Sequence, residues 1–202
     1  FVSFRNGVYL FFTSLLIGAL ASLAIGVYFY FTDPEYIMDA SVLIVTAGAG
    51  MMFGVLSQMG FFAYMMLNFI ARSMIRRRLI WSTVQWILIA IVFFDVIYLR
   101  VVHFEHEQAL LVYSALPLVL MGISLLVALW KVNMTQPTAF TPTLFFMFVA
   151  TILEAIPALR ENNAEATLFM VVPLICCNAW QILNLHRLVG NEEPAQEKTA
   201  QT

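Results

Sequence analysis

Two acidic residues, Asp95 and Glu154, lie inside long apolar stretches and are the residues of this chain best placed to do chemistry. Each precedes an arginine, Arg100 or Arg160, by five or six residues. On a helix, each acid would lie roughly 7–9 Å from its arginine along the axis. An ionised carboxylate at that depth in a membrane is costly unless it is paired or neutralised, so each acid is a candidate for a functional site.

Two interpretations of these acids stay open. Asp95 and Glu154 could line a polar cavity that binds a cation or a signal, or they could pair with the two arginines and fix helix packing. Amide and hydroxyl side chains form a second polar set, which comprises Ser57, Gln58, Asn68, Gln85, Asn178, Gln181 and Asn184. Amides inside a membrane bundle most often bond between helices, at around 1 kcal/mol each, and a ligand site is the alternative.

Small residues recur at helical spacing along the first two apolar stretches. In the first stretch they occupy every fourth position, as Ser14, Gly18, Ser22 and Gly26. Such stripes let helix backbones approach closely, either inside one bundle or against the helix of a partner. The candidate helix-contact face in the second stretch consists of Gly50, Gly54, Ser57, Gly60 and Tyr64.

The motifs of common enzyme classes are missing from the sequence. There is no P-loop, no GxSxG and no dinucleotide-binding motif, and His103, His106 and His186 form no paired ligand set. Cys176 and Cys177 are adjacent, so they imply no disulfide framework. We therefore expect no enzymatic activity, no cofactor and no metal site.

The composition places most of the chain in lipid. Of its 202 residues 62% are hydrophobic and 11% are charged, whereas a soluble domain has about a quarter charged residues. Mean hydropathy is +0.88. A span needs about 20 apolar residues, and the second stretch exceeds that length. The sequence predicts an all-α membrane domain over residues 1–188, with spans at 8–31, 40–70, 79–99, 109–130, 143–159 and 166–185, and a disordered cytoplasmic tail at 189–202.

Lysine and arginine predict the orientation of this six-helix bundle. With the N-terminus inside, eight of the ten basic residues are cytoplasmic, and only Arg100 and Arg160 are outside. Both ends of the chain are then cytoplasmic. Anionic lipid headgroups are the expected partners of one short basic loop, which contains Arg72, Arg76, Arg77 and Arg78. Nucleic-acid binding has no other support in the sequence.

Two helix hairpins show a weak internal similarity. Phe94–Arg100 closes the third span and Leu153–Arg160 closes the fifth, and each is followed by an acidic loop and a proline-containing span. This pattern predicts a parallel repeat of hairpins 3-4 and 5-6. Chance similarity between two apolar hairpins is the competing explanation.

The segment Ser57–Tyr64, with sequence SQMGFFAY, resembles the KinB-signalling pathway activation (KbaA) family, and so does Phe94–Arg100. Chain length and hydropathy agree with that family from end to end. The resemblance implies a multispan membrane protein of endospore-forming Bacillus relatives that promotes the activity of a membrane-bound sporulation sensor kinase. It implies no catalytic residues.

Three functions therefore compete. The first is a positive regulator of a sensor kinase, which acts through lateral helix contacts or as an accessory sensor. The second is a small solute-binding protein or transporter that uses Asp95 and Glu154. The third and weakest is an intramembrane enzyme that acts on lipid.

Overall fold

The structure is a computed structural model that describes residues 4–32, 37, 39–75, 77–103, 110–160 and 163–189. Within these ranges it is α-helical and contains no strand, as the all-α class predicts. In chain order the elements are α1 (Phe4–Thr32), α2 (Ala40–Met74), α3 (Arg78–His103), α4 (Leu110–Met134), the 3₁₀ turn η1 (Pro137–Ala139), α5 (Phe140–Phe145), the π-helical turn η2 (Phe146–Ala150), α6 (Thr151–Arg160) and α7 (Ala164–Val189). Of the predicted tail, only Val189 is among the described residues.

Six helical segments of the described chain are long and apolar enough to cross a membrane. Five of them are the single helices α1, α2, α3, α4 and α7, and the other runs through Pro137–Arg160. The observed helices extend a few residues beyond most of the predicted spans, because polar residues in the end turns still make backbone hydrogen bonds.

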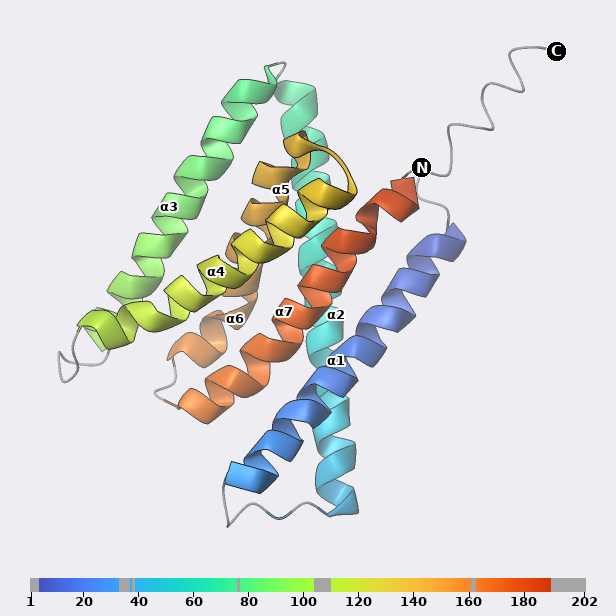
Figure 1. Ribbon diagram of the computed structural model, residues 1–202, viewed down its shortest axis with the longest axis vertical. Helices are drawn as coiled ribbons and strands as arrows, with labels where there is room; N and C mark the ends of the chain where they lie inside the picture. Colours follow the sequence, from blue (N-terminus) through green and yellow to red (C-terminus); the bar gives the residue numbers. More distant parts are fainter. Residues whose placement is uncertain are drawn as a thin grey trace.

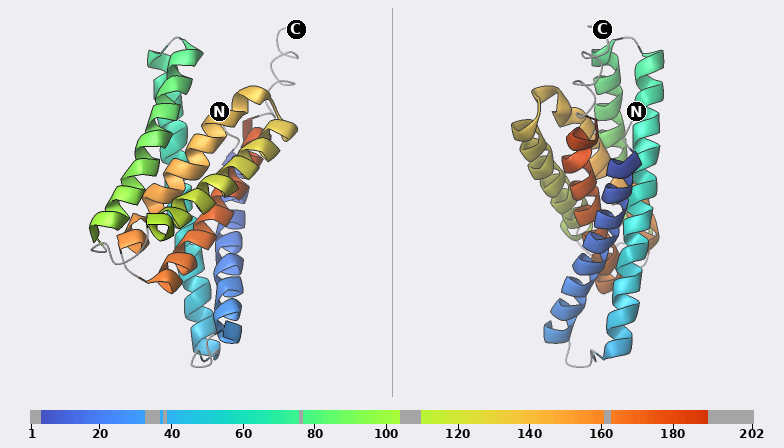
Figure 2. Two further views of the ribbon diagram at one scale, coloured as in Figure 1. Left: turned by 60° about the vertical axis from the view of Figure 1, so that its left-hand side comes forward. Right: turned by 90° about the vertical axis from the view of Figure 1, so that its right-hand side faces the viewer.

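Helix α2 is continuous over 35 residues. At about 1.5 Å per residue it is roughly 52 Å long, which exceeds the hydrocarbon thickness of about 30 Å. The Asp39 carboxylate caps its start, because Oδ1 accepts hydrogen bonds from the Ser41 hydroxyl at 2.7 Å and the Val42 N–H at 2.8 Å. These two bonds hold the pKa of Asp39 below its ordinary value. The α1–α2 hairpin projects beyond the other helices at the end away from the termini (Figures 1 and 2).

The segment Pro137–Arg160 is the least regular part of the fold. It starts six residues before the predicted span at Thr143, because Pro137 opens a 3₁₀ turn that leads directly into α5. The π turn η2 then carries Phe146 and Phe148 into the core, where both are fully buried. Phe146 packs edge-on against Phe61 of α2, with ring centroids 5.6 Å apart. Because π turns re-aim the side chains that follow them, η2 sets the direction of α6.

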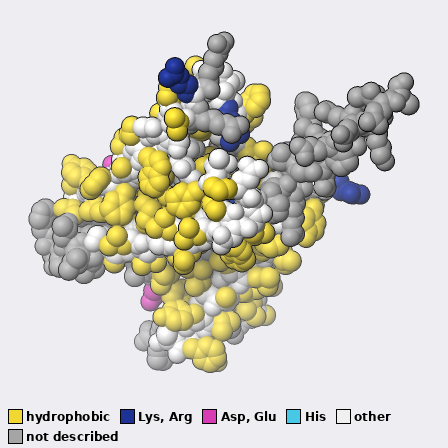
Figure 3. Space-filling model, turned by 45° about the horizontal axis from the view of Figure 1, so that its top comes forward, with side chains coloured by type: hydrophobic (Ala, Val, Ile, Leu, Met, Phe, Trp, Pro, Cys, Tyr) yellow, Lys and Arg dark blue, Asp and Glu magenta, His cyan; other side chains and the backbone are white. Residues whose placement is uncertain are grey.

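The ends of the helices divide the molecule into two sides. Figure 1 shows the start of α1 and the end of α7 on the side of the molecule where α2 meets α3 and where α4 finishes. Arg72 and Arg77 are exposed at this end. Figure 3 shows apolar side chains across much of one face, with basic side chains toward the top of the view.

Candidate functional site

Hydrogen-bonded polar side chains join four helices inside the bundle, and Asn178 of α7 lies at the centre of this polar network. The Asn178 Oδ1 atom accepts a hydrogen bond from the Ser57 hydroxyl of α2 at 2.7 Å. Its Nδ2 group donates to Thr151 Oγ1 at 3.0 Å and to Glu154 Oε2 at 2.9 Å, both on α6. Ser57, Thr151 and Asn178 are fully buried, so these bonds replace those that water would make.

The polar network continues to α1 through Cys177 and Gln181, which lie on either side of Asn178 along α7. Gln181 Nε2 donates to Ser57 Oγ at 2.8 Å and lies 3.4 Å from Ser14 Oγ. The Cys177 thiol contacts the Ser14 carbonyl oxygen at 3.3 Å. Positions 177, 178 and 181 share one face of α7 because residues three and four apart are neighbours on a helix. That single face therefore contacts α1, α2 and α6.

Glu154 occupies a space that a glycine leaves open. Thr151 and Glu154 are one turn apart on α6, so both reach Asn178. A Cβ atom at Gly60 of α2 would overlap the Oε1 atom of Glu154. That oxygen is buried and has no hydrogen-bond partner among the described atoms. The carboxyl group is therefore suited either to the neutral, protonated form or to a carboxylate that binds a water molecule or a cation.

In the structure Glu154 is hydrogen-bonded to an amide and not paired with Arg160, the arginine that the sequence suggested. Its hydrogen bond goes to Asn178, while the Arg160 side chain is exposed at the end of α6. Positions six apart on a helix point about 120° apart, which explains why the two side chains separate. The side chain of Arg100 lies outside the described residues, and positions 95 and 100 differ by about 140° around the α3 axis.

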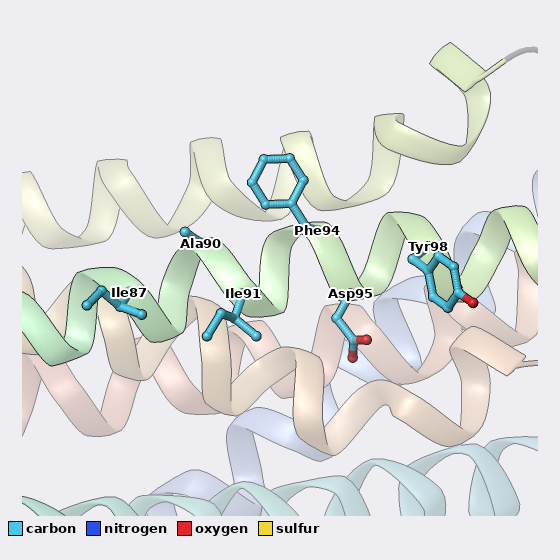
Figure 4. Close-up of a pocket in the computed structure, with 6 residues that line it drawn as sticks. All are labelled: Ile87, Ala90, Ile91, Phe94, Asp95 and Tyr98. Atoms are coloured by element: carbon cyan, nitrogen blue, oxygen red, sulfur yellow. The ribbon is translucent and has the colours of Figure 1, made fainter.

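Asp95 lies on the other side of α6 from this network. It is exposed, and with Leu153 and Ile156 it lines a narrow gap of about 40 Å³ between α3 and α6. It also borders a shallow hollow of about 490 Å³ along α3 (Figure 4). Because Glu154 is directed toward α7 instead, the structure does not bring the two acids together.

The candidate helix-contact face of α2 is occupied by the protein's own helices. A Cβ atom at Gly50 would collide with the Gly18 carbonyl oxygen of α1, and one at Gly54 would come within 3.1 Å of the Ser14 carbonyl oxygen. The Tyr64 hydroxyl donates to the Pro142 carbonyl oxygen at 3.0 Å. With Ser57 and Gly60 already facing α7 and α6, a partner helix could reach this face only if the bundle opened.

The rest of the predicted polar set divides into paired and unpaired side chains. Asn68 accepts a hydrogen bond from Trp81 Nε1 at 3.1 Å, and Asn184 bonds to a carbonyl of its own helix. Gln58 is 2% exposed, yet neither of its amide atoms has a hydrogen-bond partner among the described atoms. The Nε2 atom of Gln85 is also buried without one. These amides are thus candidates for contact with water or a ligand.

The basic residues at the terminal end have different surroundings. Arg72 and Arg77 are exposed, as contact with lipid headgroups requires. Arg76 and the side chain of Arg78 lie outside the described residues. Lys131 is buried, and its Nζ donates to the Leu183 carbonyl oxygen near the end of α7 at 3.1 Å. Lys131 therefore connects α4 to α7, a role that the count of positive charges did not indicate.

Sequence reasoning also missed Thr151 as a member of the polar network. The available signal was its position one turn before Glu154, which places both on one helical face. Ser14 appeared only as a small residue, although its hydroxyl and its carbonyl both bond across helices or within α1. The described residues contain no group of three or more His, Cys, Asp or Glu side chains placed to hold a metal ion.

The fold and the network together define an all-α bundle whose long helices suit a membrane and whose buried polar groups bond mostly to one another. Residues 14–188 match the family described as KinB-signalling pathway activation in sporulation. The chain belongs to this family, which confirms the resemblance of Ser57–Tyr64 and Phe94–Arg100. It is 35% identical over 196 residues to the KinB-signaling pathway activation protein of Bacillus subtilis (strain 168), with 92% of this chain and 98% of that protein covered. No solved structure matches the chain.

Proposed function

We propose that this chain is a membrane-embedded positive regulator of a KinB-type sporulation sensor kinase pathway. The observation that carries the proposal is the family match over residues 14–188, together with a curated relative named for activation of KinB signalling. A protein of this family is a regulator of a pathway, and the proposal assigns the chain no catalytic role.

Membrane embedding is supported by the surface of the bundle. Large apolar side chains such as Ile44, Phe69 and Leu79 are 74%, 72% and 82% exposed. Contiguous apolar surface on this scale is unfavourable in water and favourable in lipid. We propose the N-in, C-in orientation with a membrane domain over 1–188, because the start of α1, the end of α7 and the exposed Arg72 and Arg77 lie at the same end.

A membrane regulator of this kind acts on the kinase by binding the kinase's active state better than its inactive state. A difference of about 1–3 kcal/mol would change the ratio of the two states roughly 5- to 150-fold. Since α1, α6 and α7 cover the small-residue face of α2, lateral contacts with a kinase must use other surfaces of the bundle. The internal polar network then keeps those surfaces in a fixed arrangement.

Complementation tests this function. A B. subtilis strain that lacks the relative, and in which sporulation depends on KinB, is given this chain. We expect sporulation to rise to a level well above that of the empty vector, with phosphate flow from the kinase increased. Spore counts equal to those of the empty vector, with the chain present in the membrane, would rule the function out.

One observation favours a second candidate, a small proton- or solute-handling membrane protein. The unpartnered Oε1 atom of Glu154 is buried inside the bundle, where it could bind and release a proton. Purified protein in vesicles that contain a pH-sensitive dye would test this. Proton flux that is lost in Glu154→Gln would favour the second candidate, and flux no greater than in empty vesicles would eliminate proton transport.

A further inference from the structure

Helix α3 has two faces with opposite surroundings. Gln85, Ile89 and Val96 face the bundle and are 5% exposed or less. Ile87, Ala90, Ile91, Phe94, Asp95 and Tyr98 line the shallow hollow on its outward side (Figure 4). Their spacing is that of one stripe along a helix, with members three or four residues apart. We call these six residues the outer α3 face.

Asp95 is the one acidic residue of the outer α3 face, and it has no described partner. No hydrogen bond or ion pair joins it to another side chain in the described part of the molecule. Its neighbours along the stripe are the apolar Ile91 and Phe94 and the aromatic Tyr98. In the proposed orientation, it lies about 7 Å toward the outer side from the middle of α3. An ionised group at this depth that faces lipid is unfavourable until it gains a partner.

The shape of the outer α3 face fits a helix. Its residues extend from Ile87 to Tyr98, a rise of about 16 Å along the helix axis. Ala90 lies between larger side chains, and a small residue lets a second helix approach closely. A lipid acyl chain could fill the apolar part of the hollow, but it has no donor for the Asp95 carboxylate. A membrane-spanning helix with a lysine or arginine at the same depth would satisfy both its own charge and that of Asp95.

We propose that the outer α3 face is the docking site for a membrane-spanning helix of the kinase partner, and that a basic side chain of this helix pairs with Asp95. This inference rests on the proposed function and adds the surface and the chemistry of recognition. The contact is lateral and extends from near the middle of α3 toward its outer end, while the buried face of α3 continues to pack against the rest of the bundle, α5 and η2 included.

Site-specific photocrosslinking tests the docking site in the full-length chain. A benzophenone side chain is placed at Phe94 or Tyr98, and as a control at Phe12 or Leu20, which are exposed on α1. The chain is expressed in sporulating cells with the kinase, and the crosslinked peptides are identified by mass spectrometry. We expect crosslinks from positions 94 and 98 to a kinase helix segment that contains a lysine or arginine, and none from α1.

Substitution of Asp95 then tests the charge pair. Asp95→Leu should lower the crosslink yield at position 98 about tenfold, which corresponds to about 1.4 kcal/mol, and should lower pathway activation with it. Asp95→Asn controls for size. Restoration of the yield by Asp95→Lys together with an acid at the crosslinked basic residue would establish the pair. Membrane level of each variant is measured alongside, since an exposed position should tolerate all three changes.

Several results would overturn the docking site. These are crosslinks to lipid alone, crosslinks to a second copy of this chain, or kinase crosslinks whose yield does not change in Asp95→Leu. Pathway activation is recorded in the same cells. If the unsubstituted chain fails to activate, the proposed function itself is wrong. If the unsubstituted chain and Asp95→Leu activate equally, only the docking site is wrong.

Discussion

Asp95 and Glu154, the two acids within long apolar helical segments, occur in similar sequence contexts and have very different surroundings. Glu154 lies between α6, α7 and α2, where Asn178 donates a hydrogen bond to it. Asp95 lies on the outward side of α3, in a hollow that is otherwise apolar apart from the Tyr98 hydroxyl. The difference comes from the facing helix. Opposite Glu154 there is an amide and a glycine, while nothing of this chain covers the outer α3 face in the described structure.

This contrast distinguishes polar side chains that stabilise the bundle from a polar side chain that is available to bind a partner. The network around Asn178 joins α1, α2, α6 and α7, so its loss should affect the stability of the whole bundle. Asp95 borders α6 but makes no hydrogen bond or ion pair in the described structure, so its loss should affect binding more than stability. If hairpins 3-4 and 5-6 are a repeat, as the sequence predicts, the second copy has turned its acid inward and the first has kept it outward.

The largest expected difference between the two regions is in the free energy of unfolding, and it appears when Asn178→Leu is compared with Asp95→Leu. Asn178→Leu removes hydrogen bonds to Ser57, Thr151 and Glu154 and leaves buried groups unpaired. We expect it to lower the free energy of unfolding by about 2–4 kcal/mol, measured in bicelles by steric trapping.

Asp95→Leu is the matched control, since it also replaces a polar side chain of similar size with leucine. We expect its free energy of unfolding to equal that of the unsubstituted chain or to exceed it. A comparable loss of stability in both variants would contradict the division of the molecule into a stabilising network and an interactive face.

The next largest effect should follow from closing the space beside Glu154. In Gly60→Ala the new methyl group would overlap Glu154 Oε1, so the carboxyl group must move away from Asn178. We expect a loss of about 1–3 kcal/mol in the free energy of unfolding. Gly48→Ala is the control, because a Cβ atom there meets nothing within 4 Å. Equal stability of the two variants would show that Glu154 relocates without cost.

Much of the fold was predictable because apolar length and charge placement depend only on local sequence. The six long apolar segments belong to this class, whereas the unbroken course of α2 and the internal use of its small residues were each one of several possibilities that the sequence left open. The π turn at Phe146–Ala150 was not predictable, since no residue type in FMFVA requires it. The partner of Glu154 was not predictable either. It depends on how α7 turns toward α6, and an amide 24 residues away carries no local signal.

The third expected effect is a gain in stability when Gln58 is replaced by an apolar side chain. Gln58 is buried, and neither its amide oxygen nor its amide nitrogen has a hydrogen-bond partner in the described structure. No hydrogen bond there compensates for the free-energy cost of removing the amide from water. Gln58→Met keeps the length of the side chain and removes this cost, and we expect the free energy of unfolding to rise by about 1 kcal/mol. Gln181→Met, which breaks a bond to Ser57, should have the opposite sign. A loss of stability in Gln58→Met would show that the amide binds water or a ligand in the membrane.

The smallest change in stability is expected for Glu154→Gln, and it decides what the buried acid does. The glutamine carbonyl oxygen can still accept the hydrogen bond from Asn178, so the free energy of unfolding should change by less than about 1 kcal/mol. If Glu154 only completes the network, pathway activation should also persist, whereas Asp95→Asn should reduce it. Spore counts and unfolding measurements on both variants check this. Lost activation in Glu154→Gln at unchanged stability would instead mean that the carboxyl group must ionise or exchange a proton. Both acids would then be needed for the function.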